Sequence, residues 1–274
     1  MNASNRKVAI GFIVFYPGEK FINRIILAET LGFKIYIFDN SPKNSMVRDL
    51  CKIKNNCNYF SCGKNVGIGF GLSCICAQAY YDSYPALLYF DQDTIFNHNT
   101  LDFIEKTFIE NPQFAQRYSA IVFNSKKYID DKKKNIFVKD VLLAISSGSL
   151  FFLDNLNKSN WHNEKYFVDC VDYEFCLRSN INNYKIGECS ITPGFNHEIE
   201  QPDLGYSLFG KTRLIRKYSS RRIISATISS VRLIGVSIKF RKFDYSIEIF
   251  RSIALYLWWQ LIVRIINLFG IREK

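Results

Sequence analysis

The chain has 274 residues, of which 48% are hydrophobic and 22% charged, values that exclude a disordered or low-complexity chain and allow one full core plus an appendage. Charge is unevenly placed, because residues 1–210 hold 22 Lys/Arg and 22 Asp/Glu, whereas residues 211–274 hold 14 and 3 and so supply the whole net charge of +11. We therefore expect an anionic partner for this last segment, either membrane phospholipid, a lipid pyrophosphate or nucleic acid.

The eight cysteines form no CxxC pair, and the three histidines are too scattered to complete a zinc pattern. We expect reduced thiols that act as small apolar residues. The first seven residues are polar, and no apolar core of signal-peptide length follows them. We therefore expect a cytoplasmic protein.

Strand-like and helix-like patterns alternate along the chain. Strands are predicted at 8–15, 33–38, 58–61, 86–90, 120–123, 149–153 and 185–191, and helices at 21–31, 46–53, 72–81, 99–110 and from residue 172 onward. A glycine-rich loop is predicted at 63–69, before the third of these helices. The alternation is typical of a parallel α/β sheet.

The apolar run at 86–90 leads directly into the triplet Asp91-Gln92-Asp93. Ligands of open α/β sheets bind where strands end, so this position suits a site. Two carboxylates one residue apart repel each other unless a positive group lies nearby, and a divalent cation such as Mg²⁺ or Mn²⁺ is the simplest candidate. The alternative is a solvated turn without function.

A second acidic cluster contains Asp169, Asp172 and Glu174 within otherwise apolar sequence. Asp172 is predicted near a helix start, where it could act as a general base toward an acceptor hydroxyl. Glu174 and Arg178 are four residues apart and are expected to form an ion pair on the helix. The alternative is a charged helix cap that carries no chemistry.

Two further features are weaker on their own. The small residues at 146–149 either let the backbone approach a ligand closely or form a plain turn. His197 follows a predicted strand in a polar loop, and a lone histidine of this kind is seldom a metal ligand.

Seven segments occur in a fixed order: VAIGFIVFYP at 8–17, IFDNS at 37–41, NVGIGFG at 65–71, LLYFDQDT at 87–94, SSGSLFF at 146–152, FVDCVDYEFCLR at 167–178, and His197. Together they resemble the family 2 glycosyltransferases of GT-A fold, and within them the bacterial rhamnosyltransferase-like group. The resemblance spans about residues 7–222. It implies a GT-A catalytic domain at 1–222, which is a Rossmann-like mixed sheet flanked by helices, and a basic helical segment at 223–274.

The resemblance also implies roles for individual residues. Donor-binding residues would be Phe15, Tyr16, Asp39, Asn65, Gly67, Asp91, Ser147, Gly148, Arg216 and Arg221, with Asp39 accepting a hydrogen bond from a pyrimidine. Asp91, Asp93 and His197 would bind Mn²⁺ or Mg²⁺, and Asp172 would be the catalytic base. The sequence departs from the family in lacking Asn after Tyr16 and in having Arg222 where Asn is common.

The implied reaction is a single displacement with inversion at the anomeric carbon of a nucleotide diphosphate sugar. By the group, the donor is dTDP-rhamnose, and the alternatives are galactofuranose, galactose or glucose, including UDP-linked donors. The acceptor would be a lipid-linked or growing bacterial surface polysaccharide, such as O-antigen or capsule. A silent nucleotide-sugar binder and a nucleic-acid-binding protein are the rival interpretations, and the latter lacks any recognisable binding motif.

Beyond residue 222, apolar residues and basic residues alternate in two segments. The longest uncharged stretch, 252–263, is twelve residues long and is too short to cross a bilayer, so no span is expected. Trp258, Trp259, Arg251 and Arg264 suit a helix lying in the interface of an anionic membrane, at the inner face of the cell membrane. The alternative is a helical bundle packed on the catalytic domain or on another subunit of a homo-oligomer.

Overall fold

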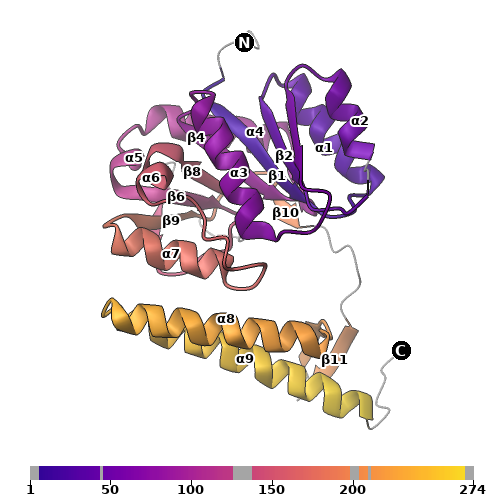
Figure 1. Ribbon diagram of the computed structural model, residues 1–274, viewed down its shortest axis with the longest axis vertical. Helices are drawn as coiled ribbons and strands as arrows, with labels where there is room; N and C mark the ends of the chain where they lie inside the picture. Colours follow the sequence, from indigo (N-terminus) through magenta and orange to yellow (C-terminus); the bar gives the residue numbers. More distant parts are fainter. Residues whose placement is uncertain (1–5, 44–45, 126–137, 198–203, 209–210, 269–274) are drawn as a thin grey trace. The chain divides into compact units, whose positions relative to one another are not determined.

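The computed structural model describes residues 6–43, 46–125, 138–197, 204–208 and 211–268, without the side chains of 197–215 and 267–268 (Figure 1). The chain divides into two compact units, Met1–Glu198 and Ile199–Lys274. The domain boundary expected after residue 222 stays a prediction, and the hairpin before the C-terminal helices falls in the second unit.

The first unit is built on an eight-stranded mixed sheet in the order β3-β2-β1-β4-β8-β6-β9-β7. Its strands are β1 (Val8–Val14), β2 (Ile35–Asp39), β3 (Cys57–Ser61), β4 (Ala86–Asp91), β6 (Tyr118–Phe123), β7 (Lys139–Val141), β8 (Ser149–Phe152) and β9 (Lys185–Cys189). The short strands β5 (Thr94–Ile95) and β10 (Asn196–His197) pair separately. Strand β8 runs antiparallel to β4 and β6, so the sheet is mixed.

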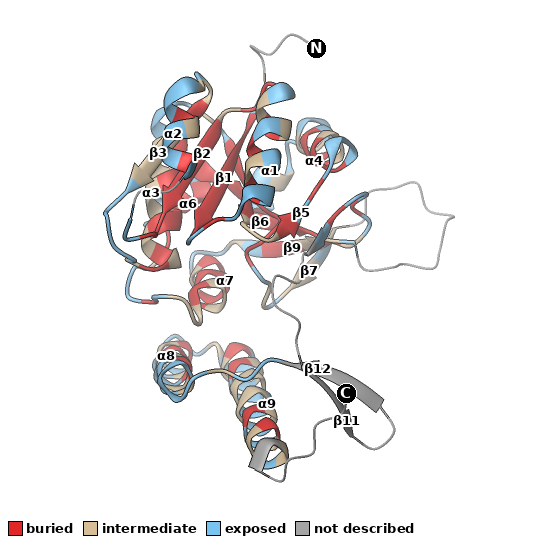
Figure 2. Ribbon diagram, turned by 90° about the vertical axis from the view of Figure 1, so that its right-hand side faces the viewer, coloured by how far each residue is buried: buried red, intermediate tan, exposed pale blue. Residues whose placement is uncertain are grey.

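Helices cover both faces of this sheet. They are α1 (Glu19–Thr30), α2 (Met46–Ile53), α3 (Ile68–Tyr81), α4 (His98–Glu110), α5 (Phe114–Arg117), α6 (Leu153–Lys158) and α7 (Val171–Ile181). Apolar residues of α1, α2 and α4 form one core with alternate residues of the central strands. The opposite face meets α3, since Gly71 of that helix packs on Ile13 and Phe38. Figure 2 shows the buried residues concentrated on the sheet and on the inner helix faces.

The central strands could be predicted from sequence because side chains on both of their faces are buried. All seven residues of β1, VAIGFIV, are buried, which is why the run is continuous rather than alternating. Gly11 lies at its centre because a Cβ there would come within 2.7 Å of Leu87 and 2.8 Å of Ile75. Each large apolar side chain buried in this way contributes about 1.5–3 kcal/mol to folding.

The carboxyl ends of several strands meet at one edge of the sheet. Strand β1 is parallel to β2 and β4, and its last residues pair in register with acids, Val14 with Asp39 and Ile13 with Asp91. Because β8 is antiparallel to β4, the loop that enters it at Ser149 lies at this same edge. The edge therefore gathers the candidate residues of four separate segments.

Helix α3 begins at Ile68, four residues earlier than the sequence predicts. Gly69 and Gly71 therefore lie within the helix and not in a loop. A Cβ on Gly69 would approach the carbonyl oxygen of Asn163 within 2.7 Å. Close packing of the segment before α7 explains this glycine, which pattern reasoning assigned to a turn.

Cys51 and Cys57 form a disulfide between α2 and β3, with Cα atoms 5.1 Å apart. The expectation that every thiol is reduced is wrong for this pair, because the turn after α2 returns the chain to the helix and brings the two residues together. The other six cysteines are not disulfide-bonded among the described residues, and Cys76, Cys176 and Cys189 are buried, as small apolar residues would be.

The second unit contains the hairpin β11 (Leu204–Leu208) and β12 (Lys211–Ile215), followed by helices α8 (Ser220–Lys239) and α9 (Phe243–Leu268). The two helices pack together near their connection, where the hydroxyls of Ser237 and Ser246 lie 2.6 Å apart. The segment Phe243–Ile266 is long and apolar enough to cross a membrane by length and composition. The expectation that this segment does not span a membrane stays a prediction, and it rests on the uncharged stretch 252–263, which is shorter than the whole helix.

Candidate functional site

Two aromatic side chains are exposed where β1 ends. Phe15 and Tyr16 keep 45% and 56% of their surface exposed, and their rings lie 4.6 Å apart. Tyr16 has a positive φ of 49°, held by a hydrogen bond of 2.7 Å from its N–H to Oγ of Ser41. Exposed aromatic rings on a rigid strand end provide a stacking surface for a planar base. The residues predicted from the sequence are thus placed at the carboxyl edge.

Asp39 is fully buried at the end of β2. Its Oδ1 accepts a hydrogen bond of 2.8 Å from the N–H of Ser41, and its Oδ2 accepts one of 3.0 Å from the hydroxyl of Tyr59. Buried carboxylates need such donors. In this structure Asp39 therefore orients Tyr59 and the Ser41 backbone, and direct contact with a pyrimidine stays a prediction.

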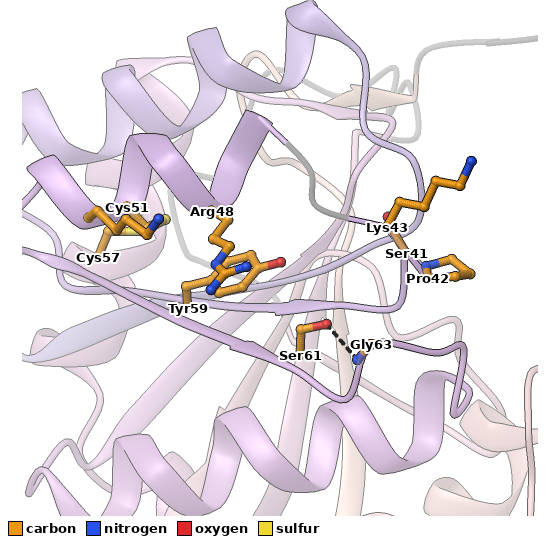
Figure 3. A pocket seen from close by; sticks show the side chains of 10 residues that line it. Ser41, Pro42, Lys43, Arg48, Cys51, Cys57, Tyr59, Ser61 and Gly63 are labelled. Atoms are coloured by element: carbon orange, nitrogen blue, oxygen red, sulfur yellow. Dashed lines mark hydrogen bonds between the residues drawn. A yellow bond between two sulfur atoms is a disulfide. The ribbon is translucent and has the colours of Figure 1, made fainter.

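A cavity of about 510 Å³ opens beside Tyr59, between α2 and β3 (Figure 3). Its described lining residues include the cations Lys43, Arg48 and Lys52 and no acid. Figure 3 shows Arg48 and Tyr59 among the side chains that line it. Sequence reasoning did not find these residues, because cations on an exposed helix follow no pattern that separates a site from a solvated surface.

The turn that carries the acidic triplet is held from two sides. The side-chain Oε1 of Gln92 accepts a hydrogen bond of 2.8 Å from the N–H of Phe15. The backbone carbonyl oxygen of Gln92 accepts one from the buried guanidinium of Arg24 in α1. Oγ of Ser147 accepts a hydrogen bond of 3.1 Å from the N–H of Asp91. Asp91 and Asp93 are only partly buried, so their carboxylates reach the edge of the sheet.

Tyr89 is a site residue that the sequence did not reveal. It is 1% exposed, and its hydroxyl donates a hydrogen bond to Oδ1 of Asp91. Burial, and then the charges of Asp91, Asp172 and Asp93, hold the pKa of Tyr89 well above its usual range. The Tyr89 hydroxyl therefore binds one carboxylate of the triplet and lies within electrostatic range of Asp93 and Asp172.

Asp172 lies in the first turn of α7, two residues after the N-cap residue Cys170, whose φ of 66° places it in the left-handed region. The hydroxyl of Ser146 donates a hydrogen bond to its Oδ1. Burial raises the pKa of Asp172 to about 6, opposed by the Ser146 hydrogen bond and assisted by the charge of Asp91. A carboxylate of this kind is ionised at neutral pH yet basic enough to accept a proton.

The predicted ion pair on α7 is confirmed. Nε of Arg178 lies 2.9 Å from Oε1 of Glu174, and both side chains are mostly buried. The Arg178 guanidinium also donates to the carbonyl oxygen of Ser159. The pair fixes α7 against the preceding segment and lies on a different side of the helix from Asp172.

Ser147 and Gly148 pack next to the acidic triplet. Ser147 is 4% exposed, and its hydroxyl lies 2.6 Å from that of Thr94. Gly148 has a φ of +82°, and a Cβ there would approach the Phe195 ring within 2.9 Å. Their residue types are explained by packing and hydrogen bonding within the fold, and contact with a donor stays a prediction.

Asn65 and Gly67 lie between the end of β2 and the segment that leads to Asp172. Asn40 donates to the carbonyl oxygen of Gly67 at 3.2 Å, and Asn65 accepts from the N–H of Gly67 at 3.0 Å. Gly67 has a φ of +90°, and a Cβ there would lie 2.5 Å from the carbonyl oxygen of Phe167. Asn65 is exposed, so its outer face is open to a ligand.

The backbone of His197 pairs with that of Thr94, next to Asp93 in the chain. The side chain of His197 lies outside the described residues. Among the residues that the structure does describe, no group of three or more His, Cys, Asp or Glu side chains is arranged to hold a metal ion. The pair Asp91 and Asp93 nevertheless supplies the oxygen donors that Mg²⁺ and Mn²⁺ prefer, in a cluster whose mutual repulsion a cation would relieve.

Arg216 and Arg221 belong to the second unit, where both side chains are exposed. The carbonyl oxygen of Arg216 accepts a hydrogen bond of 2.8 Å from the side chain of Gln260 in α9. Gln260 also accepts a hydrogen bond of 3.0 Å from the N–H of Tyr218. The described contacts tie this segment to the C-terminal helices, and a role at the diphosphate stays a prediction.

Crystal structures of TarS from S. aureus have a similar fold. TarS 1-349 matches with a TM-score of 0.51 and 13% identity over 70% of this chain and 60% of the TarS chain. A longer TarS chain matches with a TM-score of 0.51 and 16% identity over 70% of this chain and 36% of its own. TarS 1-349 in complex with UDP-GlcNAc gives a TM-score of 0.50 at 16% identity over 70% and 59%.

No protein-family model matches the sequence, and no curated protein does. The chain spans less than two thirds of each of these TarS chains. At these identities the likeness establishes the fold alone. The expected fold class, a GT-A type mixed sheet flanked by helices with a C-terminal helical extension, is confirmed.

Proposed function

We propose that the chain is an inverting, metal-dependent glycosyltransferase that uses a nucleotide diphosphate sugar. The observation that carries the proposal is that two neighbouring serines of one loop hold both acidic segments at the carboxyl edge of the sheet, since Ser147 accepts from the N–H of Asp91 and Ser146 donates to Asp172. The two acidic segments are distant in sequence, and this loop connects both of them. The fold shared with TarS, which was crystallised with UDP-GlcNAc, supports a nucleotide-sugar donor.

Asp172 is the base in this proposal. As the acceptor oxygen attacks the anomeric carbon, the Asp172 carboxylate takes the hydroxyl proton, and the bond to the diphosphate oxygen breaks with its electron pair. Ser146 donates to Oδ1 and thereby orients the carboxylate. The raised pKa, about 6, leaves Asp172 ionised at neutral pH and improves its proton affinity relative to an ordinary aspartate.

Asp91 and Asp93 would hold Mn²⁺ or Mg²⁺, with His197 as a further ligand. When bound, such a cation neutralises charge that develops on the departing diphosphate. The side chains of Arg24, Gln92 and Ser147 hold the triplet in one conformation, because each forms a hydrogen bond to a backbone group in or next to it. This rigid support reduces the ordering needed when the donor binds.

The donor is a dTDP- or UDP-linked sugar, with rhamnose the first candidate by resemblance and galactofuranose, galactose or glucose the alternatives. Phe15 and Tyr16 present exposed rings for the base, and the hydroxyl of Tyr59, held by Asp39, lies at the adjacent cavity. The acceptor is a lipid-linked or growing surface polysaccharide. Such an acceptor places the enzyme on the cytoplasmic face of the cell membrane.

The C-terminal helices support membrane association. Apolar residues recur along one face of α9 at helical spacing and remain exposed, among them Phe243, Ile247, Phe250, Trp258, Leu261 and Ile265. The opposite face carries the buried Tyr245 and Ile249. The outward stripe extends over about 33 Å of helix, at 1.5 Å per residue. An exposed apolar stripe of this length marks a membrane or protein contact.

Helix α8 has the same organisation. Ile224, Ile228, Val231 and Ile238 form its exposed stripe, while Ala226 and Leu233 are buried. Basic residues flank the exposed stripe on α8, namely Arg221, Arg232 and Lys239. This combination favours an anionic bilayer as the partner. The alternative, association of copies into a homo-oligomer, would cover the same stripes.

A ligand screen tests the proposed donor. Melting temperatures would be measured with UDP, dTDP, GDP and their sugar conjugates, with and without Mn²⁺. We expect the largest increase for a uridine or thymidine diphosphate sugar with Mn²⁺, and its loss in Asp93→Ala. No stabilisation by any nucleotide with either metal would contradict the proposal.

A further inference from the structure

A second cavity lies beside α3, and its lining does not include Asp91, Asp93 or Asp172. It has a volume of about 710 Å³ and is enclosed by the first half of α3, the segment 160–165 and Arg178 of α7. We call it the Trp161 cavity. Among the described residues of the first unit, those that resemblance assigns to the donor or the metal are not part of its lining.

His162, which lines this cavity, is the most unusual group there. It is 2% exposed, and neither of its ring nitrogens has a hydrogen-bond partner among the residues that the structure describes. Its ring stacks on Phe175 at 4.9 Å and meets the edge of Phe151 at 5.0 Å. A buried polar group left unpaired costs about 1–3 kcal/mol. Both nitrogens are closed off from solvent, so the imidazole is a packed ring behind the cavity wall, and the accessible lining is supplied by its neighbours.

The chemistry of the lining is that of a sugar-binding surface. Phe70, Ala77 and Trp161 provide apolar and aromatic faces, and Ser73 and Asn163 provide neutral polar groups. A sugar ring has one apolar C–H face and a rim of hydroxyls, so it needs both kinds of contact.

The Trp161 cavity differs in the charge of its lining from the cavity beside Tyr59. Glu164 and Lys165 balance each other in its lining, and Arg178 is paired with Glu174 at 2.9 Å. The cavity beside Tyr59 has three cations and no acid among its described lining residues. The Trp161 cavity consequently suits a neutral, polyhydroxylated ligand better than a phosphate.

The cavity is connected to the candidate base through packed contacts. The hydroxyl of Ser73 donates to the carbonyl oxygen of His162 at 2.8 Å, and the side chain of Asn163 donates to Glu174 of α7 at 3.3 Å. The N–H of Ile68 donates to the carbonyl oxygen of Phe167 at 2.6 Å. The segment that forms the cavity wall is thus the segment that leads to Asp172.

We propose that the Trp161 cavity binds a sugar unit of the acceptor glycan, as a subsite beyond the sugar that reacts. The proposal rests on the proposed function for the identity of the ligand as an acceptor. Occupation of this subsite holds the acceptor chain against the segment that carries Asp172. Longer acceptors therefore bind more tightly than single sugars.

Saturation-transfer NMR with methyl glycosides of rhamnose, galactose, glucose and N-acetylglucosamine tests the subsite, with no nucleotide or metal present. We expect at least one glycoside to bind to the full chain and its affinity to fall at least tenfold in Trp161→Ala. Ala77→Trp, which fills the cavity from a partly exposed helix position, should have the same effect without removing a packed side chain. Tyr81→Ala is the matched control, because Tyr81 is a 79% exposed aromatic residue on the same helix outside the cavity.

Unchanged binding in Ala77→Trp, or no binding of any of the four glycosides, would overturn the proposal. Asp172→Asn keeps the two hypotheses apart, because it should retain glycoside binding while losing transfer. If the wild-type chain binds a glycoside in this cavity but transfers no sugar, the subsite stands and the proposed function fails.

Discussion

Tyr89 and Asp91 lie two residues apart on β4, and the buried hydroxyl of Tyr89 donates a hydrogen bond to the carboxylate of Asp91. Residues i and i+2 of a strand share a face, so the hydroxyl meets the carboxylate without any distortion of the strand. The Tyr89 hydroxyl thereby orients the Asp91 carboxylate, which is a proposed ligand of the metal ion. Groups in this position orient metal ligands and tune their affinity.

Replacing this donor should weaken metal dependence. In Tyr89→Phe the Asp91 carboxylate loses its hydrogen bond, and we expect the Mn²⁺ concentration for half-maximal activity to rise about 10-fold or more. Tyr36→Phe is the matched control, because Tyr36 is an equally buried strand tyrosine that donates to Asp82 at 2.6 Å. Both variants should lose roughly 1–2 kcal/mol of stability. An unchanged metal titration in Tyr89→Phe would remove the hydroxyl from the site.

The raised pKa of Asp172 predicts opposite effects on activity and stability. Its pKa in the folded chain is about 6, above the ordinary aspartate value of about 3.9. Activity should rise with pH through about 6, because the base must be ionised. Stability should fall as the pH rises from about 4 to about 6, because over this range the folded chain keeps the Asp172 proton that the unfolded chain has lost, and it should change little above that range.

Asp172→Asn should therefore be inactive yet more stable at pH 7, by roughly 2 kcal/mol, with the difference vanishing near pH 4. Urea unfolding of both proteins at pH 4, 6 and 7.5 measures this, alongside the pH profile of transfer. Ser146→Ala removes a hydrogen bond to the ionised form and should shift the activity profile to higher pH. Equal stability of the two proteins at all three pH values would contradict the assignment.

Gly67 should not tolerate a side chain. Its φ of +90° and the carbonyl oxygen of Phe167, 2.5 Å from a Cβ built there, both oppose alanine. We expect Gly67→Ala to cost about 2–3 kcal/mol and to reduce activity by displacing the segment before Asp172. Gly18→Ala is the control, because a Cβ at Gly18 meets nothing within 4 Å. Similar losses in the two variants would show that the Phe167 contact is unimportant.

The exposed stripe of α9 predicts binding to anionic vesicles. Trp258 and Leu261 are 58% and 51% exposed, and the double change Trp258→Ser with Leu261→Ser should weaken binding to vesicles of anionic phospholipid about tenfold or more. Ile53→Ser, at a 77% exposed apolar position on α2, is the control and should bind as wild type. If the double variant binds as wild type and wild type forms oligomers, the stripe is a subunit contact.

Much of the first unit could be predicted from sequence because its strands are buried on both faces. The run VAIGFIV and the run ALLYFD are continuous apolar segments, and their ends place Asp39 and Asp91 at one edge. The Glu174–Arg178 pair was also predictable, because it depends only on helix spacing.

Features that depend on contacts distant in sequence could not be predicted. Glycine lowers helix propensity, so the start of α3 was placed too late; only the packing of residues 163–167 explains Gly67 and Gly69. Tyr89 looks like any buried strand residue until Asp172 is brought beside it. The Cys51–Cys57 disulfide depends on the turn between α2 and β3, which no CxxC pattern marks.

The central claim is that this edge of the sheet transfers sugar from a nucleotide diphosphate. Release of nucleoside diphosphate from dTDP- and UDP-sugars would be measured with Mn²⁺ or Mg²⁺ and a lipid-linked glycan acceptor, for wild type, Asp93→Ala, Asp172→Asn and the control Asp49→Asn on the surface of α2. We predict metal-dependent release that falls at least 100-fold in Asp93→Ala and Asp172→Asn and is unchanged in Asp49→Asn. Release that is equal in wild type and Asp172→Asn, or tight donor binding with no release, would contradict it.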